Sequence, residues 1–170
     1  MLNQTMRFGT GIRSKVRPAA SASDHLGRNV RVMEIVEESM RKEIADRWVC
    51  ALRSGRYLQT RSFFLNDSSG YCCLGVLCDM SKLGTWKDYS SVNASPVLSY
   101  VTDENGSCKM LPEDVKVWAG MRSSNGDLEG TEQVLPPGIM IPWLSLAGAN
   151  DQGADFNDIA DLIERNWEKL

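Results

Sequence analysis

The chain has 170 residues, a net charge of −3 and 42% hydrophobic residues, which is ordinary for one globular domain with a buried core. No apolar run approaches the roughly 20 residues of a membrane-spanning helix. Residues 1–30 also lack the apolar segment of a secretory signal. We therefore expect a cytosolic protein without a membrane partner, whose five cysteines are free thiols.

Residues 1–32 are rich in Arg, Ser, Gly and Ala, and they are predicted to form a disordered basic tail. They hold six Lys or Arg and one Asp, a net charge of +5, which leaves −8 for residues 33–170, the predicted single globular domain. An acidic domain of this kind is a poor binder of nucleic-acid backbones. Two alternatives for the tail are an organelle transit peptide and a misassigned start, with the native protein beginning at Met33 or Met40.

The clearest predicted helix spans residues 34–54 and ends at Ser54 and Gly55. Its apolar residues recur at every fourth position and form one stripe: Val36, Met40, Ile44, Trp48 and Leu52. The next segment, residues 57–65, is predicted to be a strand, and the turn-forming residues 66–70 close it.

The stretch "GYCCLGVLCDM", residues 70–80, is apolar on every side and holds three cysteines. An element that is apolar all round is buried all round, so we predict a short core helix over residues 72–82 that stops at Gly84. A buried strand is the alternative. Free cysteine packs as a small apolar group, and glycine lets neighbouring elements approach. The packed residues are expected to be Cys72, Cys73, Gly75 and Cys78, and Cys50 and Cys108 are expected to be buried in the same way.

Residues 85–111 are predicted to form a β-meander, because "PVLSYVT" and "SCKML" flank the turn sequence "DENG". A short helix follows in "LPEDVKVWAGM", with Pro112 in its first turn and Gly120 at its end. The five tryptophans lie in separate segments, which is typical of core anchors.

Two helices are predicted at the C-terminal end, a short one over residues 143–149 and a longer one capped by Asp155 together with Asp158. Gly153 is expected to end the shorter helix, and Asn150 or Asp151 to bind loop backbone. The longer helix has one apolar face: Phe156, Ile159, Ala160, Ile163 and Trp167. Together these elements predict an α+β fold, a small antiparallel sheet with N-terminal, central and C-terminal helices packed on it.

Two of these stretches, with a third lying between them, carry a resemblance to a known family. "GYCCLGVLCDM", followed by "LPEDVKVWAGM" and then by "NDQGADFNDIADLIE", resembles a family of small proteins of tailed bacteriophages and prophages, over residues 40–170. The resemblance implies a phage accessory protein expressed in the bacterial cytoplasm, and such proteins often counter host defences. It implies no reaction and no catalytic residues.

Neither a metal nor a cofactor is expected. Zinc sites use C-x(2–4)-C pairs, whereas here two adjacent cysteines are followed by a four-residue gap. A cysteine nucleophile needs a base such as histidine, and the single histidine, His25, lies in the predicted tail. "NDQGADFND" lacks the glycine and glutamate spacing of an EF-hand. A carboxylate pair acting as acid and base remains open, because acidic residues are plentiful.

The stretch "LRSGRYLQTRS" is the place in the acidic domain where three arginines cluster. In a strand, Tyr57, Gln59, Arg61 and Phe63 share one face. The strand leads to the start of the core helix, whose free backbone N–H groups can bind an anion. We predict a site for a phosphate or nucleotide-like ligand, and a solvated strand face with ordinary salt bridges is the alternative. The predicted ligand-binding residues are Arg53, Arg56, Tyr57 and Arg61.

Three functions are therefore open. The first is a non-enzymatic accessory protein that binds a host protein or sequesters a nucleotide-like signal. The second is a protein–protein interaction module without a small-molecule pocket. The third is a thiol- or carboxylate-based enzyme. A buried polar pocket at Arg56 and Arg61 would favour the first, an exposed apolar patch the second, and a carboxylate pair with perturbed pKa values in a cleft the third.

Overall fold

The computed structural model describes residues 22–23, 29–30, 39–89, 96–103, 105–128 and 145–170. The chain divides into two units, Met1–Glu37 and Glu38–Leu170. In the first unit, strands β1 (Ala22–Ser23) and β2 (Asn29–Val30) pair in antiparallel fashion. The remainder of the predicted tail, including His25, lies outside the described residues.

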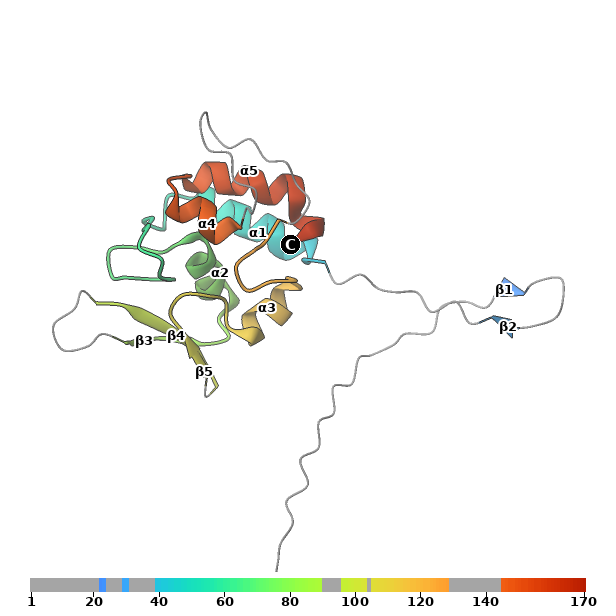
Figure 1. Ribbon diagram of the computed structural model, residues 1–170, viewed down its shortest axis with the longest axis horizontal. Helices are drawn as coiled ribbons and strands as arrows, with labels where there is room; N and C mark the ends of the chain where they lie inside the picture. Colours follow the sequence, from blue (N-terminus) through green and yellow to red (C-terminus); the bar gives the residue numbers. More distant parts are fainter. Residues whose placement is uncertain (1–21, 24–28, 31–38, 90–95, 104, 129–144) are drawn as a thin grey trace, which may run out of the picture. The chain divides into compact units, whose positions relative to one another are not determined.

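The described part of the second unit holds five α-helices and a three-stranded antiparallel sheet, which confirms the predicted α+β class (Figure 1). A short 3₁₀ turn, η1 (Trp167–Lys169), follows the last helix. The sheet has the order β3–β4–β5, as expected for a meander, but the strand predicted in "SCKML" is wrong beyond Ser107, because the last strand is Asn105–Ser107 and begins inside the predicted turn. The elements are α1 (Lys42–Arg53), α2 (Cys73–Ser81), β3 (Thr85–Asp88), β4 (Leu98–Thr102), β5 (Asn105–Ser107), α3 (Glu113–Ala119), α4 (Leu146–Asp151) and α5 (Phe156–Asn166).

Helix α2 is the centre of the core. It contacts α1, α3 and α4, and Figure 1 shows it between α1 and the sheet. Five of its apolar residues have no exposed surface, as the all-round apolar sequence predicts: Cys73, Leu74, Val76, Leu77 and Cys78. The indole Nε1 of Trp48 in α1 donates to the Cys73 carbonyl oxygen at 3.0 Å. The core is therefore organised around a helix, and the sheet joins it at one side.

Gly75 allows α2 to approach the backbone at Leu65 closely, as the sequence analysis expected of a glycine in this helix. A methyl group built on its Cα would collide with the backbone carbonyl oxygen of Leu65. The predicted helix and its start are confirmed, since Cys72 is the N-cap. The helix ends earlier than Gly84, because Lys82 adopts a left-handed conformation with φ of +55°.

Helix α1 begins at Lys42, so the prediction of a helix from residue 34 is wrong over residues 39–41. The backbone N–H of Arg41 bonds to the Ala119 carbonyl at the end of α3, at 2.8 Å, instead of joining a helical turn. Met40 is nevertheless buried, and the stripe of Ile44, Trp48 and Leu52 is buried as predicted. Val36 lies outside the described residues.

The predicted strand over residues 57–65 is wrong. The segment forms a single isolated bridge, between Gln59 and Tyr71, and it bends from Ser62 onward. The predicted turn at residues 66–70 is confirmed. Its short polar side chains hold it, because Asn66 Oδ1 accepts from the Ser68 N–H at 3.0 Å and Asp67 accepts from the Ser69 N–H.

The helix caps follow the predictions closely. Gly120 ends α3 with φ of +75°, and Asp155 and Asp158 form a capping box at the start of α5. Helix α4 is capped by Ser145 and runs to Asp151, two residues beyond its predicted end. Among the tryptophans, Trp48 is fully buried, and Trp86, Trp118 and Trp167 are half-buried and pack against the core from its edge. Trp143 lies outside the described residues.

Candidate functional site

The predicted arginine cluster is divided by the fold. Arg53 ties α1 to α5, because its guanidinium donates to Glu164 at 2.7 and 3.0 Å and also pairs with Asp161. The hydrogen bond from Arg53 lowers the pKa of the Glu164 carboxyl. Two carboxylates therefore already occupy the donors of Arg53.

Tyr57, Gln59 and Arg61 do not share the face that a strand would give them. The Tyr57 hydroxyl donates to Asp79 at 2.9 Å, toward α2, whereas Gln59 Nε2 donates to Asn150 in α4. Burial, and then the bond to Asp79, raise the pKa of Tyr57 to about 12. Arg61 is exposed and makes only long contacts, 3.4 Å to Gln59 Oε1 and to the Gly153 carbonyl. Arg56 is exposed as well. Binding of an anion by Arg56, Tyr57 and Arg61 stays a prediction.

An aromatic row continues from Tyr57 across the sheet. The rings of Tyr57, Tyr71, Trp86 and Tyr100 meet edge to face, with centroids 4.8–5.6 Å apart. Asp79 lies beside this row and accepts from Tyr57, from Trp86 Nε1 at 3.3 Å and from Lys82 at 2.9 Å. Burial raises the pKa of Asp79, but these three donors outweigh it and lower the pKa overall. The row joins the 57–71 segment, α2 and the sheet.

Three of the cysteines are packed as predicted and two are not. Cys72, Cys73 and Cys78 are buried, whereas Cys50 is exposed and Cys108 is half-buried, which corrects the expectation for these two. Burial raises the pKa of Cys73 and Cys78. A hydrogen bond with Cys73, and then the backbone N–H groups of Gly75 and Leu74, lower the pKa of Cys72. Within the described ranges, no three His, Cys, Asp or Glu side chains gather so that they could hold a metal ion.

Asn150 joins α4 to the 57–61 segment. Its side chain is fully buried; Nδ2 donates to the Thr60 carbonyl at 2.9 Å and Oδ1 accepts from Gln59. Close by, the Cys73 thiol donates to the Leu146 carbonyl at 3.4 Å. The expectation that Asn150 binds loop backbone is confirmed, and the loop is the distant 57–61 segment. Asp155 caps α5 beside this junction.

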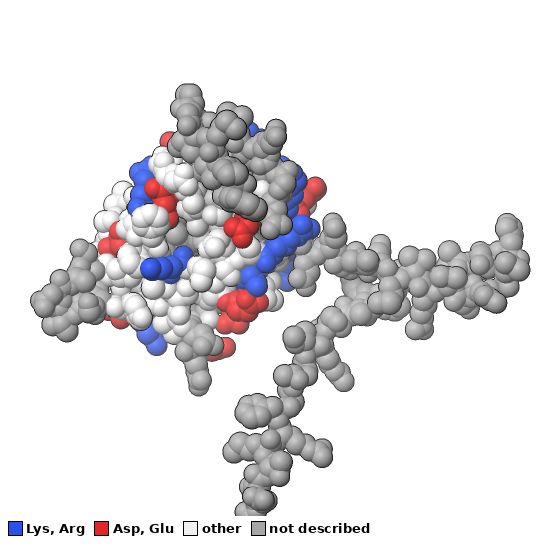
Figure 2. Space-filling model, in the orientation of Figure 1, with Lys and Arg blue, Asp and Glu red and all other residues white. Residues whose placement is uncertain are grey.

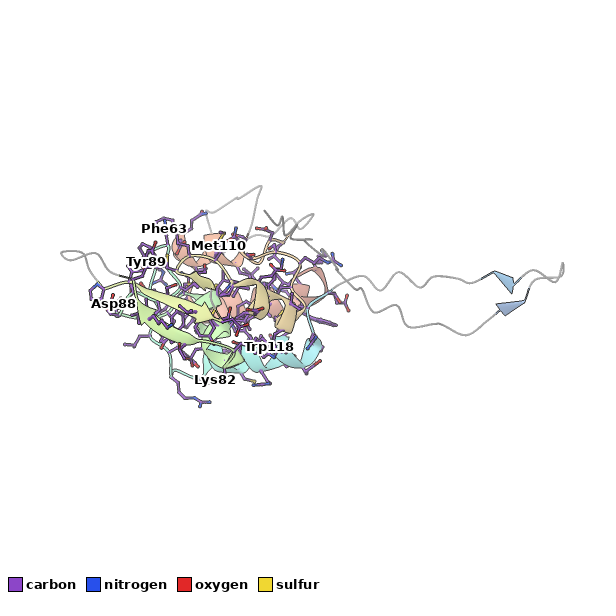
Figure 3. All side chains as sticks on the ribbon, turned by 90° about the horizontal axis from the view of Figure 1, so that it is seen from below. Phe63, Lys82, Asp88, Tyr89, Met110 and Trp118 are labelled. Carbon is purple, nitrogen blue, oxygen red and sulfur yellow. The ribbon has the colours of Figure 1, made fainter. Side chains whose placement is uncertain are left out.

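Two exposed apolar side chains stand out on neighbouring loops. Phe63 is 69% exposed and Met110 is 50% exposed, and their segments are joined by the bond from the Leu65 N–H to the Cys108 carbonyl at 2.7 Å (Figure 3). Phe63 also has φ of +62°, a backbone conformation that bulky residues avoid. Below, we call Phe63 and Met110 the Phe63 patch.

A shallow groove lies at α3. The groove has a volume of about 430 Å³. Figure 3 labels Trp118, which lines the groove from α3, and Lys82, which precedes the lining residue Leu83. Its lining combines apolar and acidic side chains: Leu83, Thr102, Asp103, Asp114, Val117 and Trp118. On the face drawn in Figure 2, by comparison, acidic and basic side chains are interspersed over a mostly uncharged surface.

A comparison with known families places the chain. The model described as "Domain of unknown function (DUF8296)" matches residues 40–167. The chain belongs to this family. No curated protein and no solved structure matches the chain significantly. The DUF8296 match contains all five described helices and the three-stranded sheet, together with the Asn150 junction, and it excludes β1 and β2.

Asp67 in the DUF8296 domain has a strongly lowered pKa. Burial raises the pKa of Asp67, but hydrogen bonds from Ser62, Ser69 and Thr60 outweigh it and hold that pKa at about 2. Thr60 Oγ1 donates to Asp67 Oδ2 at 2.6 Å and so fixes the 60–67 loop. A carboxylate with such a low pKa is a weak base at neutral pH. Asp67 and Asp79 both accept several hydrogen bonds that hold neighbouring segments in place, and the same bonds lower their pKa values.

Sequence reasoning missed both the Phe63 patch and the groove in this DUF8296 chain. Alternation along a strand placed Phe63 beside Tyr57, and no local signal marks a left-handed conformation at phenylalanine. The groove residues come from three segments that only the tertiary fold brings together. No helix among the described residues is long and apolar enough to cross a membrane.

Proposed function

We propose that the DUF8296 domain is a non-enzymatic module that binds another protein. The observation that carries this proposal is the Phe63 patch: an aromatic ring and a methionine side chain, both at least half exposed, on two hydrogen-bonded loops. Aromatic residues and Met are enriched where proteins meet, because aromatic rings bury much area and the flexible Met side chain adapts to irregular surfaces. The partner would offer an apolar pocket for the Phe63 ring.

The backbone at Phe63 strengthens the proposal. A left-handed conformation costs a bulky residue about 1–3 kcal/mol, and such strain persists where function requires it. The bond from Thr60 to Asp67 and the bond from Leu65 to Cys108 hold the loop on both sides. The fold thus keeps an apolar ring in water, in a strained conformation, although neither feature stabilises the free protein.

The resemblance to phage and prophage proteins supports a more specific proposal, that the partner is a protein of a bacterial host and that binding blunts a defence. The test begins with affinity capture from a bacterial lysate, and the retained protein is then purified for direct calorimetric titration. Phe63→Gly removes the ring and the strain together. We expect it to abolish binding while stabilising the fold by about 1 kcal/mol.

Leu58→Ser is the matched control, since Leu58 is 73% exposed but is separated from Phe63 by the contacts of Gln59 and Thr60 with α4. It should bind as the wild type does, and Met110→Ser should bind more weakly. Unchanged affinity of Phe63→Gly for the purified partner would refute the proposal.

A second candidate function is sequestration of a nucleotide-like anion at Arg56, Tyr57 and Arg61. Arg56 and Arg61 favour it, because neither has an ion-pair partner in the described part of the chain. Calorimetric titration with cyclic and ADP-ribose-type nucleotides tests it. Arg61→Ala should weaken binding by about 1.5–3 kcal/mol through the lost charged hydrogen bond. Arg53→Ala, which breaks only the pairs to α5, should not. No binding by the wild type would rule out this function.

A further inference from the structure

We propose that the groove at α3 binds the guanidinium group of an arginine side chain presented by a partner protein. The groove is apolar along one part of its lining and acidic along another. Leu83 and Val117 are 44% and 60% exposed, and Trp118 is half-buried beside them. Its volume of about 430 Å³ is within the range of ligand sites and far exceeds one water molecule.

The acidic part of the lining has no cation of its own. Asp103 and Asp114 form no ion pair within the described ranges. The two lysines that are next in sequence to the groove residues Leu83 and Val117 are engaged elsewhere, since Lys82 pairs with Asp79 at 2.9 Å and Lys116 pairs with Glu113 at 2.8 Å. Two uncompensated carboxylates beside apolar surface attract a cation and repel an anion.

Thr102 adds an independent observation that points to a ligand. It lines the groove, is only 2% exposed, and its Oγ1 has no hydrogen-bond partner among the described residues. An unpaired buried hydroxyl is costly, and native proteins rarely keep one. Because Oγ1 has almost no accessible surface, a ligand N–H would reach it only after the Thr102 side chain turns toward the groove, and donation to Oγ1 would then remove this cost.

Among cationic groups, the guanidinium fits this lining best. It carries five N–H donors in one plane, so it can reach two carboxylates and a hydroxyl at once, whereas an ammonium is a compact point charge. Its flat face also stacks on a tryptophan ring, here that of Trp118. The aliphatic stem of the arginine would pack against Leu83 and Val117.

This inference goes beyond the proposed function, because the groove shares no residue with the Phe63 patch. The probe is an acetylated and amidated leucyl-arginyl-leucine peptide. It is titrated into the full-length chain while the Trp118 indole signal and the groove amides are followed by heteronuclear NMR. The comparison peptides carry citrulline, lysine or norleucine in place of the arginine.

We expect the arginine peptide to shift these signals saturably and the citrulline and norleucine peptides to leave them in place. Asp103→Asn combined with Asp114→Asn should weaken binding about tenfold or more. Glu43→Gln combined with Glu168→Gln removes two exposed carboxylates outside the groove and should have no effect. Phe63→Gly should also bind the peptide normally, so that a failure of this inference is distinguishable from a failure of the proposed function.

Thr102→Val separates a ligand-binding role from a structural one. It should raise the midpoint of thermal unfolding by relieving the unpaired hydroxyl, yet weaken peptide binding severalfold. Three results would overturn the inference: no saturable shift with the arginine peptide, equal shifts with citrulline or lysine, or full affinity in the doubly substituted Asp103 and Asp114 variant.

Discussion

The buried amide of Asn150 donates a hydrogen bond to the backbone carbonyl of Thr60 across 90 positions of sequence. Asn150 Oδ1 also accepts a hydrogen bond from Gln59 Nε2. With these two bonds, one side chain in α4 holds the irregular 57–61 segment against the helical core. The segment has no ladder of its own, so a polar side chain supplies what a strand would have obtained from a neighbour.

Asn150→Ala should therefore be strongly destabilising. It leaves the Thr60 carbonyl unpaired in a buried site, and we expect a loss of about 1–3 kcal/mol for this unsatisfied group. Gln59 Nε2 loses one acceptor but keeps its bond to the Ala154 carbonyl at 2.9 Å. Urea denaturation followed by tryptophan fluorescence measures it. Asn157→Ala, on the exposed side of α5, is the control and should change stability little. A loss below about 1 kcal/mol would show that water replaces the amide.

Gly75→Ala should invert the usual effect of this substitution. In a helix interior, alanine is more favourable than glycine by roughly 0.5–1 kcal/mol. Here the added methyl collides with the Leu65 carbonyl, so we expect destabilisation of about 2 kcal/mol or more. Gly148→Ala in α4 is the matched comparison, because its added methyl meets side-chain atoms alone, the Ser145 hydroxyl at 3.1 Å and the Gln152 amide nitrogen at 3.9 Å. Calorimetric melting measures the stability of both variants, and we expect only Gly75→Ala to melt at a clearly lower temperature. A stabilised Gly75→Ala variant would contradict the packing described for α2.

The cysteines should differ in reactivity as they differ in burial. In the native protein a thiol reagent should modify Cys50 rapidly, Cys108 more slowly, and Cys73 and Cys78 only after unfolding. Cys73→Ser should cost about 1–3 kcal/mol, because a hydroxyl replaces a thiol in an apolar site. Cys50→Ser should cost almost nothing. Rapid native labelling at Cys73 would show that α2 opens easily. Elemental analysis tests the separate expectation that the cysteines hold no metal, which stoichiometric zinc would contradict.

Asp67 should make the fold sensitive to acid. Its pKa is about 2 in the folded chain, below the ordinary value of 3.8. A lowered pKa contributes stability that is fully present above the unfolded pKa and is lost as pH falls through the folded one. The wild type should therefore lose stability between about pH 4 and pH 2, and Asp67→Asn should lose less over that interval. Glu168→Gln should follow the wild type. Parallel curves for wild type and Asp67→Asn would refute this assignment.

Local patterns were sufficient for most of the helical structure. The all-round apolar composition of residues 73–78 predicts a buried element, because such a segment has no side to present to water. Asp155 and Asp158 predict the start of α5, and Gly120 the end of α3, because capping is decided within one turn. The class of the fold follows from these elements and from the turn sequence of the β-meander.

Other features depended on contacts between distant residues. Arg41 leaves the helix because its N–H finds the Ala119 carbonyl, and Arg53 leaves the arginine cluster because α5 offers it two carboxylates. Residues 57–65 read as a strand but lack a partner strand, and a strand exists only through pairing. Phe63, Thr102 and Trp118 likewise owe their exposure or burial to what surrounds them. Periodicity along a chain determines which face is apolar, whereas only the tertiary fold determines what covers that face.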